Sequence, residues 1–252
     1  MIIIIASKVN KASMNIAREC EHLGLKVHYC EEDVLFIKEL PEADAYIILS
    51  THKSESEMPC LTSHFLGNFG TAATHGGNPG ELAYSYPTLQ KIYMRSLNSL
   101  KEELAKPELE KYQVVIEATH HGPTHFKAPV LFVEIGSCEK EWNEKPAAEL
   151  VAAAVKKTLG KIKDEKFLKQ AIAFGGTHYP DKLTKIIIEG EYAIGHILPK
   201  YQRKNLSEEM MDQMLAKSIE KPKYCIIDYK GINQKQRIIE WAKSKGLEVV
   251  KV

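Results

Sequence analysis

The chain has 252 residues, of which 44% are hydrophobic and 27% charged, and its formal net charge is +1. This hydrophobic content supports a large buried core, and no apolar run approaches the ~20 residues that a membrane-spanning helix needs. The five cysteines are scattered without a C-x-x-C pair, which argues against a disulfide framework or a zinc ribbon. We therefore expect a cytoplasmic protein without a signal peptide or a membrane segment.

Strands and helices are predicted to alternate along the chain. Apolar runs typical of strands occupy residues 2–6, 26–30, 45–50, 62–65, 113–118, 130–135, 170–174, 193–197, 224–228 and 248–251. Spaced apolar positions and capping residues predict helices over residues 12–23, 87–105, 146–159, 207–217 and 232–245, with a further helix starting near Asp181. Several strands are continuous apolar runs, which suits strands covered on both faces. We predict a three-layer α/β/α fold with a mixed, mostly parallel sheet, as a single domain over residues 1–252 with a possible weak subdivision near residue 160.

Residues 51–80 form the first segment with possible chemistry. The segment is rich in Ser, Thr, Gly and Asn, and it contains His52, His64 and His75. Long loop-like segments are uncommon in compact domains unless they are functional. Gly76 and Gly77 would let the backbone approach a ligand closely. An ordinary glycine-rich surface loop is the alternative, and the pattern fits neither a P-loop nor a dinucleotide-binding motif.

The sequence THHGPTH at residues 119–125 is the strongest motif, because three imidazoles follow directly after a predicted strand. Neutral imidazole is a common metal ligand and a good proton shuttle. Neighbouring side chains of an extended strand point to opposite faces, so His120 and His121 share one ion only if the chain turns sharply. The Gly122-Pro123 pair is typical of such a turn. The alternative is a histidine that caps a turn or forms a hydrogen bond in the core.

Glu134 lies within the next apolar run, where a carboxylate is costly to bury unless it is paired or binds a metal. It is a candidate metal ligand, a general base or a partner that orients a histidine. Ser137 and Cys138 follow it, but no G-x-S-x-G sequence surrounds the serine, and a single cysteine is usually inert.

Two later segments with polar residues follow predicted strands. Gly175 and Gly176 precede His178, and their N–H groups could bind an anion or an oxyanion. Lys200 and Tyr201 begin a short basic and aromatic segment, a composition that can bind phosphate and stack on bases, although solvated lysines are more common. Residues 1–150 carry a charge of −7 and residues 151–252 a charge of +8, so the second half could face a polyanion or present a solvated lysine-rich surface.

Taken in order, six motifs resemble those of the archaeal and plant D-aminoacyl-tRNA deacylases. They are LTSHFLGN at 61–68, THGGNP at 74–79, THHGPT at 119–124, EIGS at 134–137 with Trp142, AFGGTHY at 173–179 and GHILPKY at 195–201. The resemblance implies a phosphorylase/hydrolase-like α/β fold, zinc dependence and action on mischarged tRNA. The expected reaction is hydrolysis of the ester between a D-amino acid, such as D-tyrosine, and the 3′ end of tRNA.

Within that expectation we assign roles to the candidate residues. One or two zinc ions would be held by some of five residues, namely His75, His120, His121, Glu134 and His178. The expected catalytic residues are Thr119, His120, Glu134 and His178. The expected substrate-binding residues are His64, Gly76, Gly77, Gly175, Gly176, Lys200 and Tyr201. The partner would be D-aminoacyl-tRNA rather than DNA or a membrane, and the protein would be a monomer or a small homo-oligomer.

Three alternatives stay open at this point. A zinc-dependent peptidase or amidase would use the same kind of site but would not need the basic second half. An enzyme like the purine-nucleoside phosphorylases would require phosphate. A non-catalytic tRNA-binding module would bind RNA without hydrolysing an ester.

Overall fold

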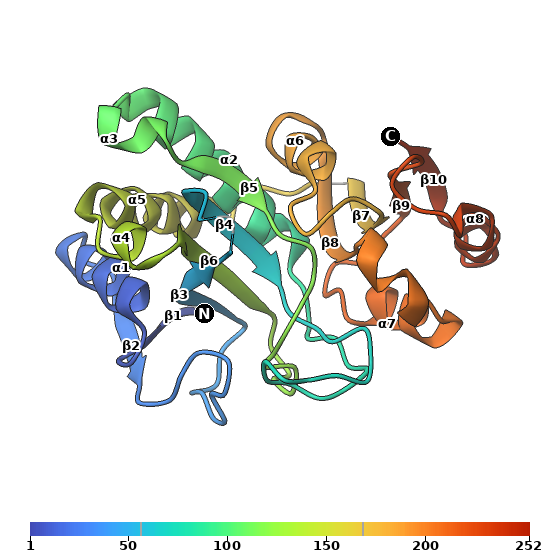
Figure 1. Cartoon of the computed structure of the whole chain (residues 1–252), viewed down its shortest axis with the longest axis horizontal. Helices are drawn as coiled ribbons and strands as arrows, with labels where there is room; N and C mark the ends of the chain where they lie inside the picture. The colour runs from blue at the N-terminus through green and yellow to red at the C-terminus, as the bar shows by residue number, and fades with distance from the viewer. Residues whose placement is uncertain (56, 168) are drawn as a thin grey trace.

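The computed structural model describes residues 1–55, 57–167 and 169–252, and it distributes the strands over two sheets (Figure 1). Within these residues the first sheet has the strand order β2-β1-β3-β6-β4-β5, and the second has the order β10-β9-β7-β8. The strands of the first sheet are β1 (Ile2–Ser7), β2 (Val27–Cys30), β3 (Ala45–Lys53), β4 (Cys60–Phe65), β5 (Gln113–Ile116) and β6 (Val130–Ser137). Those of the second are β7 (Lys169–Phe174), β8 (Tyr192–Leu198), β9 (Tyr224–Ile227) and β10 (Glu248–Lys251).

Neighbouring strands are parallel in both sheets except for the β4–β6 pair, which is antiparallel. The predicted fold class, α/β with mixed, mostly parallel pairing and helices around the sheets, is therefore confirmed. All ten predicted strands are present, with bounds that differ by at most three residues at either end. The prediction of a single domain with a possible subdivision near residue 160 stays a prediction.

Helices pack against both sheets. Their bounds are α1 (Lys11–His22), α2 (Pro87–Leu104), α3 (Pro107–Glu110), α4 (Glu139–Trp142), α5 (Lys145–Lys161), α6 (Asp181–Glu189), α7 (Glu208–Ala216) and α8 (Lys235–Ser244), with a 3-10 helix η1 (Lys200–Asn205). The predicted Ser207 cap is confirmed, since its hydroxyl accepts a hydrogen bond from the Met210 N–H at 3.1 Å. The short elements α3, α4 and η1 were not predicted, because segments of four to six residues show no apolar period. No helix in the described parts of the chain is long and apolar enough to cross a membrane.

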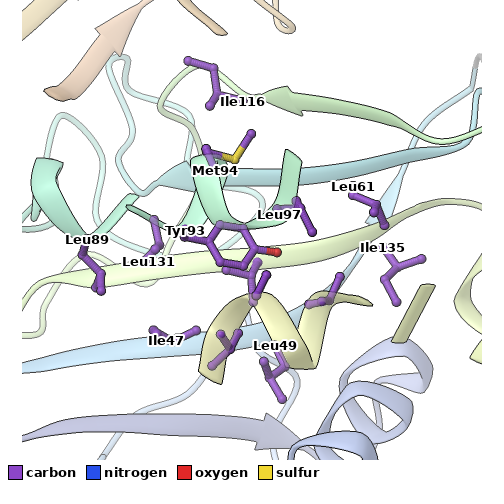
Figure 2. Packing of buried hydrophobic residues seen from close by; sticks show 14 of the residues in the cluster. Ile47, Leu49, Leu61, Leu89, Tyr93, Met94, Leu97, Ile116, Leu131 and Ile135 are labelled. Carbon is purple, nitrogen blue, oxygen red and sulfur yellow. The ribbon is translucent and has the colours of Figure 1, made fainter. Parts of the chain in front are cut away.

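Helix α2 occupies the centre of the molecule and packs on the first sheet together with α1 and α5. Its side chains Leu89, Tyr93 and Leu97 are fully buried, and Figure 2 shows them among the apolar residues of β3, β4 and β6. The same helix contacts β8 of the second sheet, so α2 lies between the two sheets. Helices α7 and α8 contribute Met214 and Trp241 to the core on the other face of the second sheet.

The opposite face of the first sheet is covered by loops rather than by helices. Its apolar cluster joins Ile48 of β3 and Phe132 of β6 to residues of the connecting segments, such as Val34, Leu66 and Phe126. Irregular backbone over a sheet leaves room for polar side chains to converge between strand and loop. This loop-covered face carries the candidate site.

A buried cation, Lys91, and a partly buried one, Arg95, join α2 to the second half of the chain. The Lys91 ammonium, which is fully buried, donates hydrogen bonds to the carbonyls of Ile187, Gly190 and Tyr192, each at 2.8 Å. One turn later, Arg95 donates to the carbonyl of Gly190 at 2.7 Å. These carbonyls lie at the carboxyl end of α6 and the start of β8, where helical hydrogen bonding has ended. The two cations therefore satisfy the end of α6 and hold it against α2.

We predict that Lys91→Met lowers the free energy of unfolding by about 3 kcal/mol, because the carbonyls of Ile187 and Tyr192 lose the Lys91 donor and that of Gly190 keeps only Arg95. Urea unfolding followed by circular dichroism measures the change. Lys101→Met is the matched control on the same helix, since no polar contact of its ammonium is found in the described residues, and we expect its effect to stay within ~0.5 kcal/mol. Equal effects of the two substitutions would contradict the role assigned to Lys91.

Candidate histidine and carboxylate site

Strand register places several polar residues on the loop-covered face of the first sheet. Ser50 of β3 and Thr62 of β4 both pair with Glu134 of β6. Since side chains alternate along a strand, His52 and His64, two residues further along β3 and β4, face the same side as Glu134. All three side chains are buried. The site therefore lies on the face of the sheet as well as at its strand ends.

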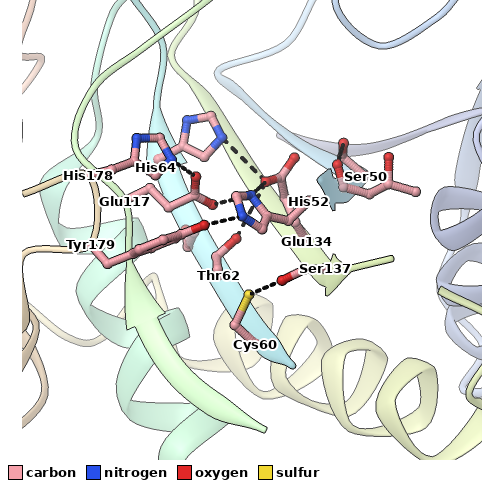
Figure 3. A network of polar contacts seen from close by, with 12 residues as sticks. Ser50, His52, Cys60, Thr62, His64, Glu117, Glu134, Ser137, His178 and Tyr179 are labelled. Atoms are coloured by element: carbon pink, nitrogen blue, oxygen red, sulfur yellow. Dashed lines mark hydrogen bonds and ion pairs between the residues drawn. The ribbon is translucent and has the colours of Figure 1, made fainter. Parts of the chain in front are cut away.

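Glu117 is the centre of the cluster. It follows β5 directly and is fully buried, and its carboxylate lies among three imidazoles. Figure 3 shows its contacts with His52 and His178. His178 Nε2 donates to Glu117 Oε2 at 2.7 Å, His52 Nδ1 lies 3.2 Å from Oε1, and His120 Nε2 lies 3.6 Å from Oε2. Glu117 thus connects β3, the segment after β5 and the segment after β7.

Glu134 forms a second carboxylate centre beside the first. Its Oε2 lies 3.5 Å from His52 Nδ1 and 3.6 Å from His64 Nε2. On the other side of the ring, His52 Nε2 forms a hydrogen bond with the Tyr179 hydroxyl, and the Trp142 indole N–H donates to the His52 carbonyl at 2.9 Å. His52 is therefore held between two carboxylates and two aromatic residues.

These contacts set the charges of the central pair. Burial alone would lower the pKa of His52, but hydrogen bonds with Glu117 and Glu134 outweigh it and raise the pKa of His52 to about 12. Burial alone would raise the pKa of Glu117, yet hydrogen bonds from His178 and His52 hold the pKa of Glu117 well below its usual value. We conclude that in the metal-free protein His52 is a cation paired with an ionised Glu117.

Three other imidazoles share one kind of backbone contact, but their pKa shifts differ. Each of His64, His120 and His121 has its Nδ1 hydrogen bonded to a backbone carbonyl, at 3.2, 2.8 and 2.7 Å respectively. Burial alone would lower the pKa of His64, yet the contact with Glu134 and the charge of Glu117 raise it. Burial and the neighbouring imidazoles lower the pKa of His120, and burial with His64 lowers the pKa of His121 to about 3. An Nδ1–H that donates to a carbonyl leaves the Nε2 lone pair free, which is the usual arrangement of a metal-binding histidine.

The turn that brings His120 and His121 together begins at His121 itself. His121 has a φ of 41°, in the left-handed region, and the two ring centroids lie 4.3 Å apart. The close approach of Gly77 and Gly122 holds this turn, because a Cβ on Gly122 would lie 2.2 Å from the Gly77 nitrogen. The predicted sharp turn is present.

An open cleft of about 660 Å³ leads to the cluster. It is lined by His52, His120, His121, Glu134 and His178 from the site and by residues of the segments 33–35 and 50–55. His178 is one-third exposed, more than the other imidazoles that contact Glu117. A substrate that enters the cleft would meet His178 before the deeper carboxylates.

The described residues contain three overlapping groups that could hold a metal ion, with ligand atoms within 4.8 Å of one another. They are His64 with His120 and His121, His52 with Glu117 and His178, and His64 with Glu117 and Glu134. Four of the five residues proposed from the sequence as zinc ligands, His120, His121, Glu134 and His178, fall in these groups. His75 belongs to none of them and lies exposed at the rim of the cleft.

Other proposed residues lie differently from the expectation. The Thr119 hydroxyl accepts the Ile197 N–H at 3.0 Å and contacts His196, so it joins the segment after β5 to β8 and does not line the cleft. The Gly175 N–H donates to the Leu198 carbonyl at 2.8 Å and is not available to an oxyanion.

The remaining proposed binding residues divide between the loop and the rim. Gly76 packs against Leu35, since a Cβ there would lie 2.0 Å from the Leu35 carbonyl oxygen, and Gly77 packs on the histidine turn. Gly176 faces Pro180 in a separate small hollow. Lys200 and Tyr201 lie in η1 next to His178.

His52 and Glu117 were not proposed from the sequence. Glu117 carries the same signal as Glu134, a carboxylate at the end of an apolar run, and it stands two residues before Thr119, which begins the THH motif. His52 has only its position at the end of an apolar strand, which many surface histidines share. The buried position of Glu117 in the site could have been predicted from the sequence. The position of His52 beside Glu134 depends on the register of β3 against β6.

The fold and the site define an α/β protein with a cluster of buried carboxylates and imidazoles at an open cleft. The family model for D-aminoacyl-tRNA deacylase matches residues 39–250. The D-aminoacyl-tRNA deacylase of Methanocaldococcus jannaschii is 37% identical over 254 residues, covering 98% of this chain and 97% of that protein. That of Cenarchaeum symbiosum is 39% identical over 210 residues, covering 83% of this chain and 78% of that protein.

A solved structure is also similar. The crystal structure of a conserved protein of unknown function matches with a TM-score of 0.89 at 28% identity, covering 100% of this chain and 95% of that one. The chain belongs to the D-aminoacyl-tRNA deacylase family. The family expected from the ordered motifs is confirmed, and with it the class of enzyme, a hydrolase that acts on ester bonds.

We predict that in the metal-free protein His52 stays protonated at about pH 8, where a free imidazole would be neutral. We also predict that His121 is neutral at about pH 5, where a free imidazole would be protonated. The reason is that two carboxylates face His52 while His121 is buried beside other imidazoles. Nitrogen NMR of the histidine rings, assigned with single substitutions, measures both states. A His52 ring that titrates near its unperturbed pKa would contradict the proposed charge distribution.

Proposed function

We propose that this protein hydrolyses the ester between a D-amino acid and the 3′-terminal ribose of tRNA, with D-tyrosine among its substrates and zinc as its metal. The observation that carries the proposal is the convergence of three histidines that line the cleft, His52, His120 and His178, on one carboxylate buried behind them, that of Glu117. In the reaction a water oxygen bonds to the ester carbonyl carbon, the bond to the ribose oxygen breaks, and that oxygen receives a proton. The products are free tRNA and the D-amino acid.

His178 is the residue that we assign to proton transfer. Its Nε2–H is held by Glu117, and its Nδ1 lies toward the Tyr201 hydroxyl at 3.3 Å on the open side of the site. A carboxylate that fixes one nitrogen of an imidazole orients the other nitrogen and stabilises the ring when it takes up a proton. In this arrangement His178 accepts a proton from the attacking water and returns it to the ribose oxygen.

The donor set fits a zinc ion. His64, His120 and His121 present three imidazole nitrogens with their Nδ1 atoms fixed by backbone carbonyls, and three protein ligands are typical of catalytic zinc. His64 Nε2 is buried and has no hydrogen bond within the described residues. An ion held there would act as a Lewis acid on the ester carbonyl and favour ionisation of water.

We predict that the purified protein releases D-tyrosine from D-tyrosyl-tRNA at least about tenfold faster than L-tyrosine from L-tyrosyl-tRNA, a transition-state difference of ~1.4 kcal/mol. The two esters differ only in the configuration of the α-carbon, so the comparison isolates the fit of the acyl group to the cleft. Release of radiolabelled amino acid with time measures both rates. Peptide hydrolysis with no action on either ester would favour a peptidase instead.

We predict that His64→Ala and His120→Ala each lower kcat/KM by about 10²-fold or more and reduce bound zinc, because each removes one of three imidazole ligands. Zinc is measured by elemental analysis of the protein alone. His125→Ala is the matched control in the same motif, since His125 bonds only to the exposed Lys38 carbonyl and belongs to no metal-competent group among the described residues. Full activity and zinc content in His120→Ala would exclude the proposed metal site.

A further inference from the structure

The short helix η1 forms the rim of the site on the side of His178. It begins directly after β8, and its first residue is tied to the site because the Lys200 N–H donates to the Gly176 carbonyl at 2.9 Å. Tyr201, the next residue, places its hydroxyl 3.3 Å from His178 Nδ1, and the two ring centroids lie 6.4 Å apart. The side chain of Tyr201 therefore borders His178 and is not part of the core.

Tyr201 is unusual among the aromatic residues near the site because it is 48% exposed. Large aromatic side chains are normally buried, and a ring left half in solvent beside an active site has a free face for a flat ligand. Bases of single-stranded nucleic acids stack on such rings with little dependence on sequence.

The charges around Tyr201 favour an anionic partner. Lys200, Arg203 and Lys204 belong to the same helix, which carries no acidic residue. None of the three forms an ion pair within the described residues, whereas many other lysines of the chain do. Unpaired cations beside an exposed aromatic ring are the combination found in sites for single-stranded nucleic acid.

The cleft beside His178 has a more acidic lining than η1. Among the described residues, Asp33, Glu55 and Glu57 line it together with Lys53. Phosphate groups are repelled from acidic side chains, whereas the α-ammonium group of an aminoacyl ester is attracted to them. The cleft and η1 therefore favour opposite ends of the substrate.

We propose that Tyr201 is the stacking platform for the terminal base of the tRNA 3′ end and that Lys200, Arg203 and Lys204 bind the phosphates that precede it. This inference rests on the proposed function, because the ester to be cleaved joins the amino acid to the ribose of that terminal nucleotide. The ribose then lies beside the contact between Tyr201 and His178, the acyl group enters the cleft, and the rest of the tRNA extends over η1.

Small esters test the stacking platform. We compare D-tyrosyl adenosine with D-tyrosine methyl ester, which has the same acyl group but no base. In Tyr201→Ala we expect the ratio of kcat/KM for the adenosine ester to kcat/KM for the methyl ester to fall about tenfold, within the range for one base stacked on an aromatic ring. Tyr201→Phe keeps the ring and lowers this ratio less than Tyr201→Ala. An unchanged ratio in Tyr201→Ala, with an unchanged circular dichroism spectrum, would overturn the platform.

Salt dependence tests the phosphate contacts. With D-tyrosyl-tRNA as substrate, we expect Lys204→Gln to reduce the slope of log KM against log salt concentration by ~0.7. This is the value for the loss of one contact to a phosphate of a single strand. Lys221→Gln is the matched control, because Lys221 precedes β9 and so lies at the opposite end of the second sheet. Equal slopes for the two variants would overturn the assignment of these cations. If the wild-type protein does not hydrolyse D-tyrosyl-tRNA at all, the proposed function fails and this inference fails with it.

Discussion

A buried carboxylate on Glu117 constrains the rest of the site. An ionised carboxylate removed from water is costly unless charged or hydrogen-bonding groups surround it. In this protein those groups come from three separate segments, as His52 from β3, His120 from the histidine turn and His178 from the segment after β7. The need to neutralise one carboxylate therefore fixes the relative positions of residues that are distant in the sequence.

The same region joins the two sheets. After Glu117 the chain runs beside the second sheet, where the Ala118 N–H donates to the His178 carbonyl at 2.9 Å and the Thr119 N–H donates to the Ile197 carbonyl at 3.1 Å. Thr119, which we expected in catalysis, instead completes this junction with its hydroxyl. Because the junction and the site share residues 117–120, any shift between the two sheets would also move His178 relative to Glu117. The hydrogen bonds from Lys91 and Arg95 of α2 to the carbonyls at the end of α6 restrain the same shift.

Most of the fold was predictable because its signals are local. Continuous apolar runs marked the strands, and caps such as Ser207 marked helix ends, so both followed from short stretches of sequence. The partition into two sheets and the antiparallel β4 depend on pairing between distant segments, which no local pattern encodes. The residues of the site divide in the same way, into those with a local signal and those placed by pairing between distant segments. The histidines of the THH motif were evident, whereas the inclusion of His52 and His64 in one cluster depended on the register of β3 and β4 against β6.

Three imidazoles of the cluster, His52, His120 and His121, differ in the partner of the Nδ1 atom. A carboxylate beside Nδ1 stabilises the charged ring, as at His52, whereas a backbone carbonyl fixes the ring without a full countercharge, as at His120 and His121. A protonated imidazole cannot bind a metal, and a neutral buried one can. One buried site thus holds both kinds of histidine within a few ångströms, and Glu117 contacts members of each kind. Its position allows a single carboxylate to orient a potential ligand, His120, and the proton-transferring residue, His178, at the same time.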